Sequence, residues 1–291
     1  MAGAAVQRSA SGFPREIAPG IWWLGGCLPI KANDGRGFDL GGAAEVHSHA
    51  APYLVVGTER AIMIDTGVPA HWSKVSFDLD QILGSRPLDL ILPTHWEVPH
   101  SGNLKKLFQK YPDAQAVGDL RDFHLAYRGF EERLHIAAPG TEFDLGGGYR
   151  ITVLPAPLKD LVNTAWAYES SRKVMFTSDG FAYTHHVVPE EIEDEVPFHL
   201  EGECSLMSSE LGVLPSVSQA LFITKIALYW TRYVDVGPFF VEVEELLKRY
   251  PTELLAPAHG NVISDLEKMS PILREAYRVA YAEGVGQSKG Q

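Results

Sequence analysis

The stretch that decides the fold reads Thr94-His95-Trp96-Glu97-Val98-Pro99-His100-Ser101-Gly102-Asn103. It follows the apolar run of residues 89–93, which is typical of a short buried strand, and it precedes residues 103–110, whose apolar side chains recur at helical spacing. Residues two apart in an extended loop project to the same side, so His95 and Glu97 can converge on one point. The stretch therefore predicts a strand, a loop with polar side chains on one side, and a helix.

Three side chains of this loop have the chemistry of metal ligands. His95 and Glu97 face one side, and His100 can reach back toward them from the first turn of the following helix. A mixture of imidazole and carboxylate suits zinc, iron or manganese, and does not suit calcium or copper(I). Taken alone, the pattern is equally compatible with polar residues that lie on the surface or cap the helix.

Three further segments place ligand-type residues at the ends of predicted strands. They are Asp65-Thr66-Gly67, Ser178-Asp179-Gly180 and Ala258-His259-Gly260. Active sites of α/β folds gather at strand ends, so we expect Asp179 and His259 to join His95 at a shared site.

The apolar pattern along the chain indicates two strand-rich stretches, each followed by helices. We expect strands at residues 20–24, 53–56, 61–65, 89–93, 116–118, 149–154, 165–168, 174–177 and 254–257, and helices at residues 73–83, 103–110, 222–233 and 242–248. The chain is expected to be mainly helical between about residues 190 and 250. This order predicts an α/β fold built as a four-layer αββα sandwich. We expect a single domain over residues 1–291, with an ordered core at about 17–280 and frayed ends over the first dozen residues and after Glu283.

Composition excludes several classes of partner. The chain has 25 Lys and Arg against 37 Asp and Glu, a net charge of −12, which argues against nucleic acid and against an anionic membrane surface. No run of about 18 apolar residues occurs and the N-terminus lacks an apolar signal segment, so we expect a cytoplasmic protein without a membrane partner. Cys27 and Cys204 form no CxxC pair, so no thiolate metal site is expected and both are interpreted as inert core thiols.

The ordered motifs at the strand ends resemble those of the metallo-β-lactamase superfamily. They read Ile62-Met63-Ile64-Asp65-Thr66-Gly67, Thr94-His95-Trp96-Glu97, Thr177-Ser178-Asp179 and Pro257-Ala258-His259-Gly260. The resemblance covers about residues 17–275 and implies the αββα sandwich of the metallo-β-lactamase fold.

Within the superfamily, hydrolases typically carry a second histidine where this chain has Glu97. The His-x-Glu pair followed by His-Ser-Gly is similar to the diiron domain of flavodiiron oxygen and nitric oxide reductases. That resemblance implies two metal ions, iron by preference, with zinc or manganese as alternatives. It implies that His95 and Glu97 hold the first ion, that Asp179 bridges the pair, and that His259 holds the second ion.

Two positions depart from the flavodiiron pattern. Pro99 stands where the family has a carboxylate, which leaves the second ion short of a ligand, and Asp160 falls near the position of a later family histidine. We interpret Asp160 as a replacement ligand on the first ion and His100 as a ligand on the second. His100 and Asp179 are also the candidate catalytic residues. Asp65 is expected to orient the metal loop rather than to bind metal.

Four other histidines are weaker candidates. His47 and His49 precede a strand; they could line the mouth of the pocket, but are interpreted mainly as surface polar groups. His185 and His186 follow the Asp179 loop and would at most support the ligands.

Three functions remain open at this point. The first is a diiron oxidoreductase or oxygen-binding protein acting on dioxygen or a small molecule; no flavodoxin domain is expected, so electrons would come from a separate donor protein or from the substrate. The second is a hydrolase, in which a metal-bound water with a pKa lowered toward about 7 attacks an ester, thioester, lactone or phosphodiester. The third is a degenerate paralogue that binds a ligand without catalysis. The sequence does not show the oligomeric state, and a homodimer is suggested by analogy with relatives alone.

Overall fold

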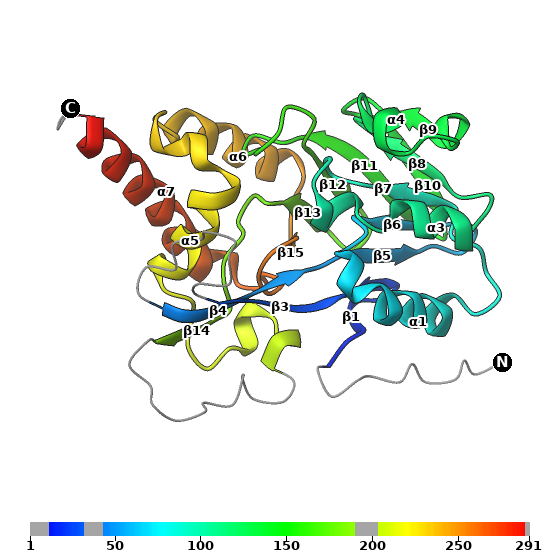
Figure 1. Ribbon diagram of the computed structural model, residues 1–291, viewed down its shortest axis with the longest axis horizontal. Helices are drawn as coiled ribbons and strands as arrows, with labels where there is room; N and C mark the ends of the chain where they lie inside the picture. The colour runs from blue at the N-terminus through cyan, green and yellow to red at the C-terminus, as the bar shows by residue number, and fades with distance from the viewer. Residues whose placement is uncertain (1–11, 32–42, 190–202, 289–291) are drawn as a thin grey trace.

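Two large β-sheets form the centre of the molecule (Figure 1), and the computed structural model describes residues 12–31, 43–189 and 203–288. The larger sheet has the strand order β1 (Arg15–Ala18), β2 (Ile21–Trp23), β5 (Tyr53–Val56), β6 (Ala61–Ile64), β7 (Leu90–Leu92), β8 (Gln115–Gly118), β9 (Leu134–Ile136). The second has the order β10 (Glu142–Gly146), β11 (Tyr149–Pro155), β12 (Ala165–Glu169), β13 (Val174–Ser178), β15 (Leu254–Pro257). A small third sheet, which the sequence did not predict, has the order β14 (His186–Pro189), β4 (Ala43–Ala50), β3 (Gly26–Lys31).

Helices cover the outer faces of both large sheets. The α-helices are α1 (Trp72–Leu83), α2 (Val98–Ser101), α3 (Leu104–Lys110), α4 (Phe123–Ala126), α5 (Val217–Ala227), α6 (Gly237–Arg249) and α7 (Leu266–Ser288). The short 3-10 helices are η1 (Pro69–His71), η2 (Glu131–Arg133), η3 (Glu203–Ser205), η4 (Ser208–Glu210) and η5 (Tyr229–Arg232). Among the described residues, no helix combines the length and the apolar character that crossing a bilayer requires.

Alternating side chains along the strands divide the apolar residues into layers. Ile62 and Ile64 of β6 lie in the core between the two sheets, whereas Met63 faces the helices on the other side. Helix α1 places Val75 and Leu79, one helical turn apart, in the same outer layer as Met63.

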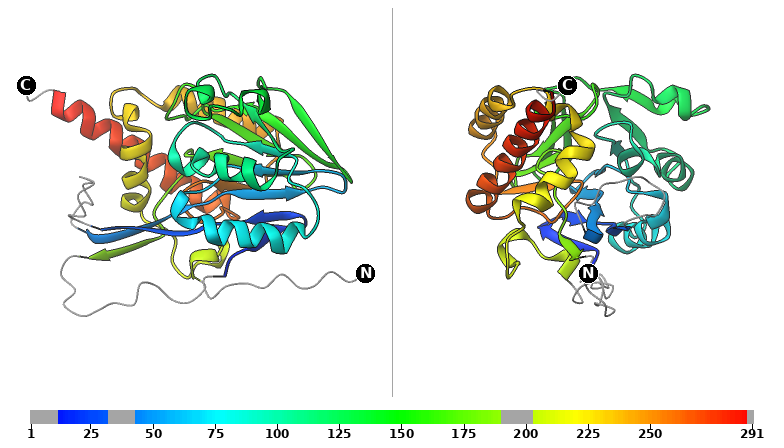
Figure 2. Two further views of the ribbon diagram at one scale, coloured as in Figure 1. Left: turned by 45° about the vertical axis from the view of Figure 1, so that its right-hand side comes forward. Right: turned by 60° about the vertical axis from the view of Figure 1, so that its left-hand side comes forward.

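The five-stranded sheet is covered in the same way on its own outer face. Met175 of β13 and Leu255 of β15 pack with Phe240 of α6 and Tyr277 of α7. In the right-hand view of Figure 2, α5, α6 and α7 lie on one side of the sheets and α1 and α3 on the other. These four layers confirm the predicted αββα sandwich.

Parallel pairing brings the polar loops to one edge of the sheets. Strand β6 pairs with β7 and β13 pairs with β15, each in parallel. The backbone N–H of Asp65 donates to the carbonyl of Leu92 at 2.9 Å, and the N–H of Ala258 donates to the carbonyl of Ser178 at 2.8 Å. Asp65 and Ser178 turn the chain with φ of 58° and 52°, a region that non-glycine residues seldom adopt. The loops after the four strands are therefore held as adjacent pairs.

The helix expected at residues 222–233 is divided into two. Helix α5 begins earlier because Ser216 caps it, its side chain accepting a hydrogen bond from the N–H of Gln219. Leu228 then leaves the helical conformation and is buried in the core, and η5 follows it. The apolar spacing runs across this break, so the prediction of one continuous helix was wrong.

The chain after Glu283 was expected to be frayed, but α7 continues to Ser288. Gly284 makes this possible by close packing, because a Cβ atom at Gly284 would lie 2.1 Å from the carbonyl oxygen of Arg232. The expected frayed start up to residue 11 and the expected helical stretch at 190–202 lie outside the described residues.

The contact at Gly284 predicts a destabilising substitution. We expect Gly284→Ala to lower the free energy of unfolding by about 1–3 kcal/mol, because the added methyl group collides with backbone. Gly286→Ala is the matched control: nothing lies within 4 Å of its Cβ position, and alanine is favoured over glycine in a helix by up to about 1 kcal/mol. Urea denaturation measures both. Equal stabilities for the two variants would contradict the packing of α7 on η5.

Candidate metal centre

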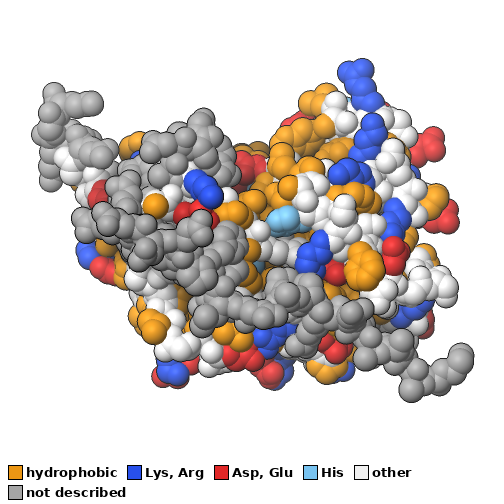
Figure 3. Space-filling view, turned by 60° about the horizontal axis from the view of Figure 1, so that its bottom comes forward, with side chains coloured by type: hydrophobic (Ala, Val, Ile, Leu, Met, Phe, Trp, Pro, Cys, Tyr) orange, Lys and Arg blue, Asp and Glu red, His pale blue; other side chains and the backbone are white. Residues whose placement is uncertain are grey.

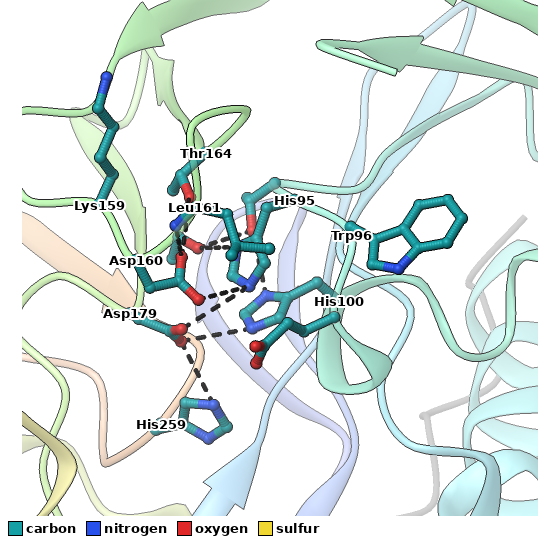
Figure 4. Close-up of polar contacts among 12 residues, drawn as sticks. His95, Trp96, His100, Lys159, Asp160, Leu161, Thr164, Asp179 and His259 are labelled. Atoms are coloured by element: carbon teal, nitrogen blue, oxygen red, sulfur yellow. Dashed lines mark hydrogen bonds and ion pairs between the residues drawn. The ribbon is translucent and has the colours of Figure 1, made fainter. Parts of the chain in front are cut away.

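Polar side chains from several loops meet at the ends of the strands (Figure 4). His95 follows β7, Asp179 follows β13 and His259 follows β15, while His100 lies in α2. Asp160 comes from the loop between β11 and β12. In Figure 4 the polar atoms of these five side chains point toward one another.

Asp179 lies at the centre of the group. Its Oδ1 atom is 3.3 Å from Nε2 of His100 and 3.3 Å from Nε2 of His259, and its Oδ2 atom is 3.8 Å from Nε2 of His95. The side chains of Asp179, His95 and His100 are at most 2% exposed. The carboxylate thus offers one oxygen to each of two sides, as a ligand that bridges two cations does.

The Nδ1 atoms of His95 and His100 are both linked to Asp65 by hydrogen bonds, whereas their Nε2 atoms face Asp179. His100 Nδ1 donates to Asp65 Oδ2 at 2.9 Å. His95 reaches Asp65 through two hydroxyl groups. Its Nδ1 lies 3.0 Å from Ser178 Oγ. Ser178 Oγ lies 2.8 Å from Thr94 Oγ1, and Thr94 Oγ1 lies 2.8 Å from Asp65 Oδ1.

The carboxylate of Asp65, at the end of this path, decides which atom donates in each hydrogen bond. An ionised carboxylate only accepts, so the hydroxyl of Thr94 donates to Asp65, the hydroxyl of Ser178 donates to Thr94, and His95 donates from Nδ1 to Ser178. Asp65 therefore fixes the proton on Nδ1 of His95 and of His100, and Nε2 of each ring becomes the atom available to a metal.

His259 is held by a different partner. Its Nδ1 donates to the backbone carbonyl of His49 at 2.5 Å, which again leaves Nε2 to face Asp179. The next residue, Gly260, has φ of +103°, and a Cβ atom there would lie 2.8 Å from the ring of Tyr183. This close approach of backbone to ring restricts the path of the loop that carries His259.

Three buried polar atoms at this point make no hydrogen bond among the described residues. They are Nε2 of His95, Nε2 of His100 and Oδ1 of Asp179. Buried polar atoms without a partner cost free energy, and such atoms in a native structure call for an explanation. A cation bound between imidazole and carboxylate satisfies all three, so this set of residues fits a metal ion.

A second group extends the site toward solvent. The ligand atoms of His95, Glu97 and Asp160 lie within 4.8 Å of one another, as do those of His95, His100 and Asp179. Asp160 Oδ2 is 3.3 Å from His95 Nε2, and Glu97 is exposed. On the face drawn in Figure 3, a histidine side chain is visible between mainly hydrophobic side chains.

The acidic residues set the charge of the site. Burial and the neighbouring Asp179 raise the pKa of Asp160 to about 7. Burial would lower the pKa of His100, but Asp65 and Asp179 hold it well above its usual range. Burial would raise the pKa of Asp179, but His100, followed by the other two imidazoles, holds it well below its usual range. The imidazoles and carboxylates of the site are therefore close enough to shift one another's protonation strongly.

The structure brings the predicted ligands together and supports the role predicted for Asp65. The assembled residues are His95, Glu97, His100, Asp160, Asp179 and His259. The expectation that His47 and His49 are surface groups was wrong, because both are fully buried. They lie on β4, which is paired on both edges, with β3 and with β14.

Three supporting residues escaped the sequence-based predictions. Thr94 and Ser178 carry the hydrogen bonds between His95 and Asp65. Asn103 donates from Nδ2 to the carbonyls of residues 66, 67 and 68, each at 3.0 Å, and so holds the Asp65 loop. Their one sequence signal is position, since each is a short polar residue beside or within a ligand motif.

Relatives of known name cover most of the chain. The coenzyme F420H2 oxidase of Methanothermobacter marburgensis is 25% identical over 264 residues, which cover 88% of this chain and 59% of the relative. That of Methanocaldococcus jannaschii is 24% identical over 266 residues, covering 87% and 58%. The chain thus spans somewhat under two thirds of the length of these relatives.

Solved structures share the fold. Rubredoxin oxygen:oxidoreductase from Desulfovibrio gigas superimposes with a TM-score of 0.65 at 15% identity, covering 91% of this chain and 61% of that one. The flavodiiron protein from Giardia intestinalis gives a TM-score of 0.61 at 18% identity, covering 95% and 59%. These likenesses confirm the predicted metallo-β-lactamase fold and the resemblance to flavodiiron proteins. The family described as ODP family beta lactamase matches residues 48–260, well over half of the sequence, and the chain belongs to that family.

Proposed function

We propose that the chain is a diiron oxidoreductase that reduces dioxygen with electrons from a separate donor. The observation that carries the proposal is the buried carboxylate of Asp179, which faces His100 and His259 with one oxygen and His95 with the other. A carboxylate shared in this way is suited to hold two cations close together.

The ligands divide between two positions. His95, Glu97 and Asp160 would hold the first ion, and Asp179 would bridge to the second. His100 and His259 would complete the second position. His100 supplies there the donor that Pro99 cannot, because proline has no side-chain donor.

Two arguments favour iron over zinc. Glu97, Asp160 and Asp179 make the set richer in carboxylate than the histidine-dominated zinc sites of hydrolases, and harder oxygen ligands suit iron or manganese. The names of similar proteins point the same way: they read coenzyme F420H2 oxidase, rubredoxin oxygen:oxidoreductase and flavo di-iron protein.

The chain's own residues hold the site in one geometry. When bound, an iron pair supplies electrons and open coordination positions to dioxygen. Asp65 keeps two imidazoles in the tautomer that ligates through Nε2, and burial keeps bulk water from Asp179. The exposed side chain of Glu97 marks the side from which a small molecule can enter. Since dioxygen reduction consumes electrons, the proposal includes a reduced cofactor or protein as donor.

Iron content and oxygen uptake test the proposal together. We expect protein produced with iron and purified without oxygen to hold about two irons per chain and, once reduced by an artificial donor, to consume dioxygen. Asp179→Asn and His95→Ala should lower the rate by more than about 100-fold, since even changes beside metal ligands cost about 10–100-fold. His124→Ala removes an exposed imidazole and should leave the rate unchanged.

Two outcomes would overturn the proposal. One is that the unsubstituted protein, loaded with iron, consumes dioxygen no faster than the Asp179→Asn variant does. The other is protein that retains only zinc and hydrolyses nitrophenyl esters or phosphodiesters in an Asp179-dependent way, which would establish the hydrolase instead.

The hydrogen bonds to Asp65 predict selective losses of metal. Thr94→Val removes the hydroxyl that links Asp65 to His95. That hydroxyl also lies 3.1 Å from His100 Nδ1, but His100 keeps its direct hydrogen bond to Asp65, so we expect the larger loss of affinity, about 10–100-fold, at the first position. Asp65→Asn should weaken both positions. Thr94→Ser keeps the hydroxyl and should bind like the unchanged chain. Anaerobic titration with iron(II), read as binding constants per site, distinguishes the three variants, and equal behaviour of Thr94→Val and Thr94→Ser would refute the role of the hydroxyl.

The raised pKa of Asp160 predicts a pH-dependent first position. Below about pH 7 the carboxyl carries a proton that a metal must displace, so the apparent affinity falls as the pH falls from 8 to 6, by up to about tenfold per pH unit for each proton displaced. Asp160→Asn has no such proton, so its weaker binding should vary less with pH. Manganese(II) titrations at several pH values measure the slope. An unchanged slope in Asp160→Asn would show that another group controls the dependence.

A further inference from the structure

A second cluster of metal-ligand side chains lies outside the candidate metal centre. Cys27 is on β3, His185 directly precedes β14 and Cys204 is in η3. One ligand atom from each of these three residues lies within 4.8 Å of the other two. The cluster and the metal centre have no residue in common.

The distances within the cluster fit a tetrahedral metal. His185 Nε2 is 3.6 Å from Cys27 Sγ and 3.6 Å from Cys204 Sγ. A zinc ion with Zn–S of about 2.3 Å and Zn–N of about 2.0–2.1 Å gives sulfur–nitrogen edges of about 3.6 Å in a regular tetrahedron. The two sulfur–nitrogen distances therefore match those between zinc ligands, and the two sulfur atoms lie within 4.8 Å of each other.

A carboxylate-backed histidine stands beside the cluster. His47 Nδ1 is 3.5 Å from Cys27 Sγ, and His47 Nε2 is 2.6 Å from Oε1 of Glu45. A carboxylate behind an imidazole fixes its tautomer and raises its basicity, as in the carboxylate–histidine pairs around zinc. His47 is outside the group of three within 4.8 Å, but it contacts Cys27 and is a candidate for a fourth ligand.

We propose that Cys27, Cys204 and His185 bind a zinc ion, at a site separate from the candidate diiron centre. Thiolate with imidazole is the ligand set that selects zinc, whereas the diiron candidates carry only imidazole and carboxylate. The ion would join three segments that are far apart in the sequence, so its role is structural: it ties the third sheet to η3.

The proposed zinc site also lies beside His49 of β4, whose backbone carbonyl holds His259 of the metal centre. The ring of His49 stacks on His185 with 4.1 Å between centroids, and its Nε2 donates to the carbonyl of Cys204 at 2.7 Å. The carbonyl of His49 accepts the hydrogen bond from His259. Ordering of β4 by zinc would therefore help to hold one ligand of the diiron candidate in place.

Cobalt(II) is the probe that tests this proposal. The chain contains two cysteines, Cys27 and Cys204, so a sulfur-to-cobalt charge-transfer band can arise at this site alone. We expect reduced, full-length protein to develop that band in the near ultraviolet, to saturate it at one cobalt per chain, and to lose it when zinc is added. Bound zinc should also raise the thermal unfolding temperature, because it binds the folded state.

Matched variants separate this site from the proposed function. Each of Cys27→Ser and Cys204→Ser should weaken the band, the double variant should abolish it, and His185→Ala should weaken cobalt binding by more than about tenfold. The exposed-histidine control His124→Ala and the diiron variant Asp179→Asn should both keep the band, so a failure of the diiron proposal leaves this test intact.

Two results would overturn the zinc site. The first is a reduced, folded chain that gives no sulfur-to-cobalt band even with cobalt in excess. The second is a Cys27–Cys204 disulfide that forms when the reduced protein is returned to air with zinc in excess. That result would identify the two cysteines as a redox-active dithiol. Circular dichroism of each cysteine variant shows whether it is folded. The cobalt titration of the unsubstituted protein tests the proposal even if a variant does not fold.

Discussion

The carboxylate of Asp65 is the group on which the geometry of the metal centre depends. One oxygen accepts from His100 and the other ends the path through Thr94 and Ser178 to His95. An imidazole can ligate through either nitrogen, and in a buried site the wrong tautomer would aim an N–H at the metal. A residue that does not touch the metal position therefore decides which atoms can bind there.

That hydrogen-bonded path explains why the fold needs both large sheets at this edge. Asp65 and Thr94 follow strands of the seven-stranded sheet, whereas Ser178 ends a strand of the five-stranded sheet. A shift of one sheet on the other would break the contact between Thr94 and Ser178. Apolar packing between the sheets, with residues such as Ile64 and Phe176 buried in one core, keeps that contact in register.

His95, Asp179 and His259, which the structure brings together, were predictable candidates because each closely follows a strand whose apolar run is clear in the sequence. Their supports were harder to predict, because Ser178 or Asn103 acts through a hydrogen bond that exists only in three dimensions. His47 and His49 were misassigned for the same reason: a polar, alternating strand such as β4 becomes buried only when β3 and β14 pair with it. The predicted helix ends were wrong where packing overrode the spacing of apolar residues, as at Leu228 and Gly284.

The same reasoning explains why the cluster of Cys27, His185 and Cys204 could not be predicted from the sequence. Sequence patterns for thiolate sites rely on two cysteines a few residues apart, whereas Cys27 and Cys204 are far apart in the sequence. Strand β4 links both candidate sites, since His47 contacts Cys27 and the carbonyl of His49 anchors His259. Because that anchor is a backbone carbonyl, it depends on where the strand lies rather than on the side chain at position 49. The position of β4 is therefore the physical link between the proposed zinc site and His259 of the candidate metal centre.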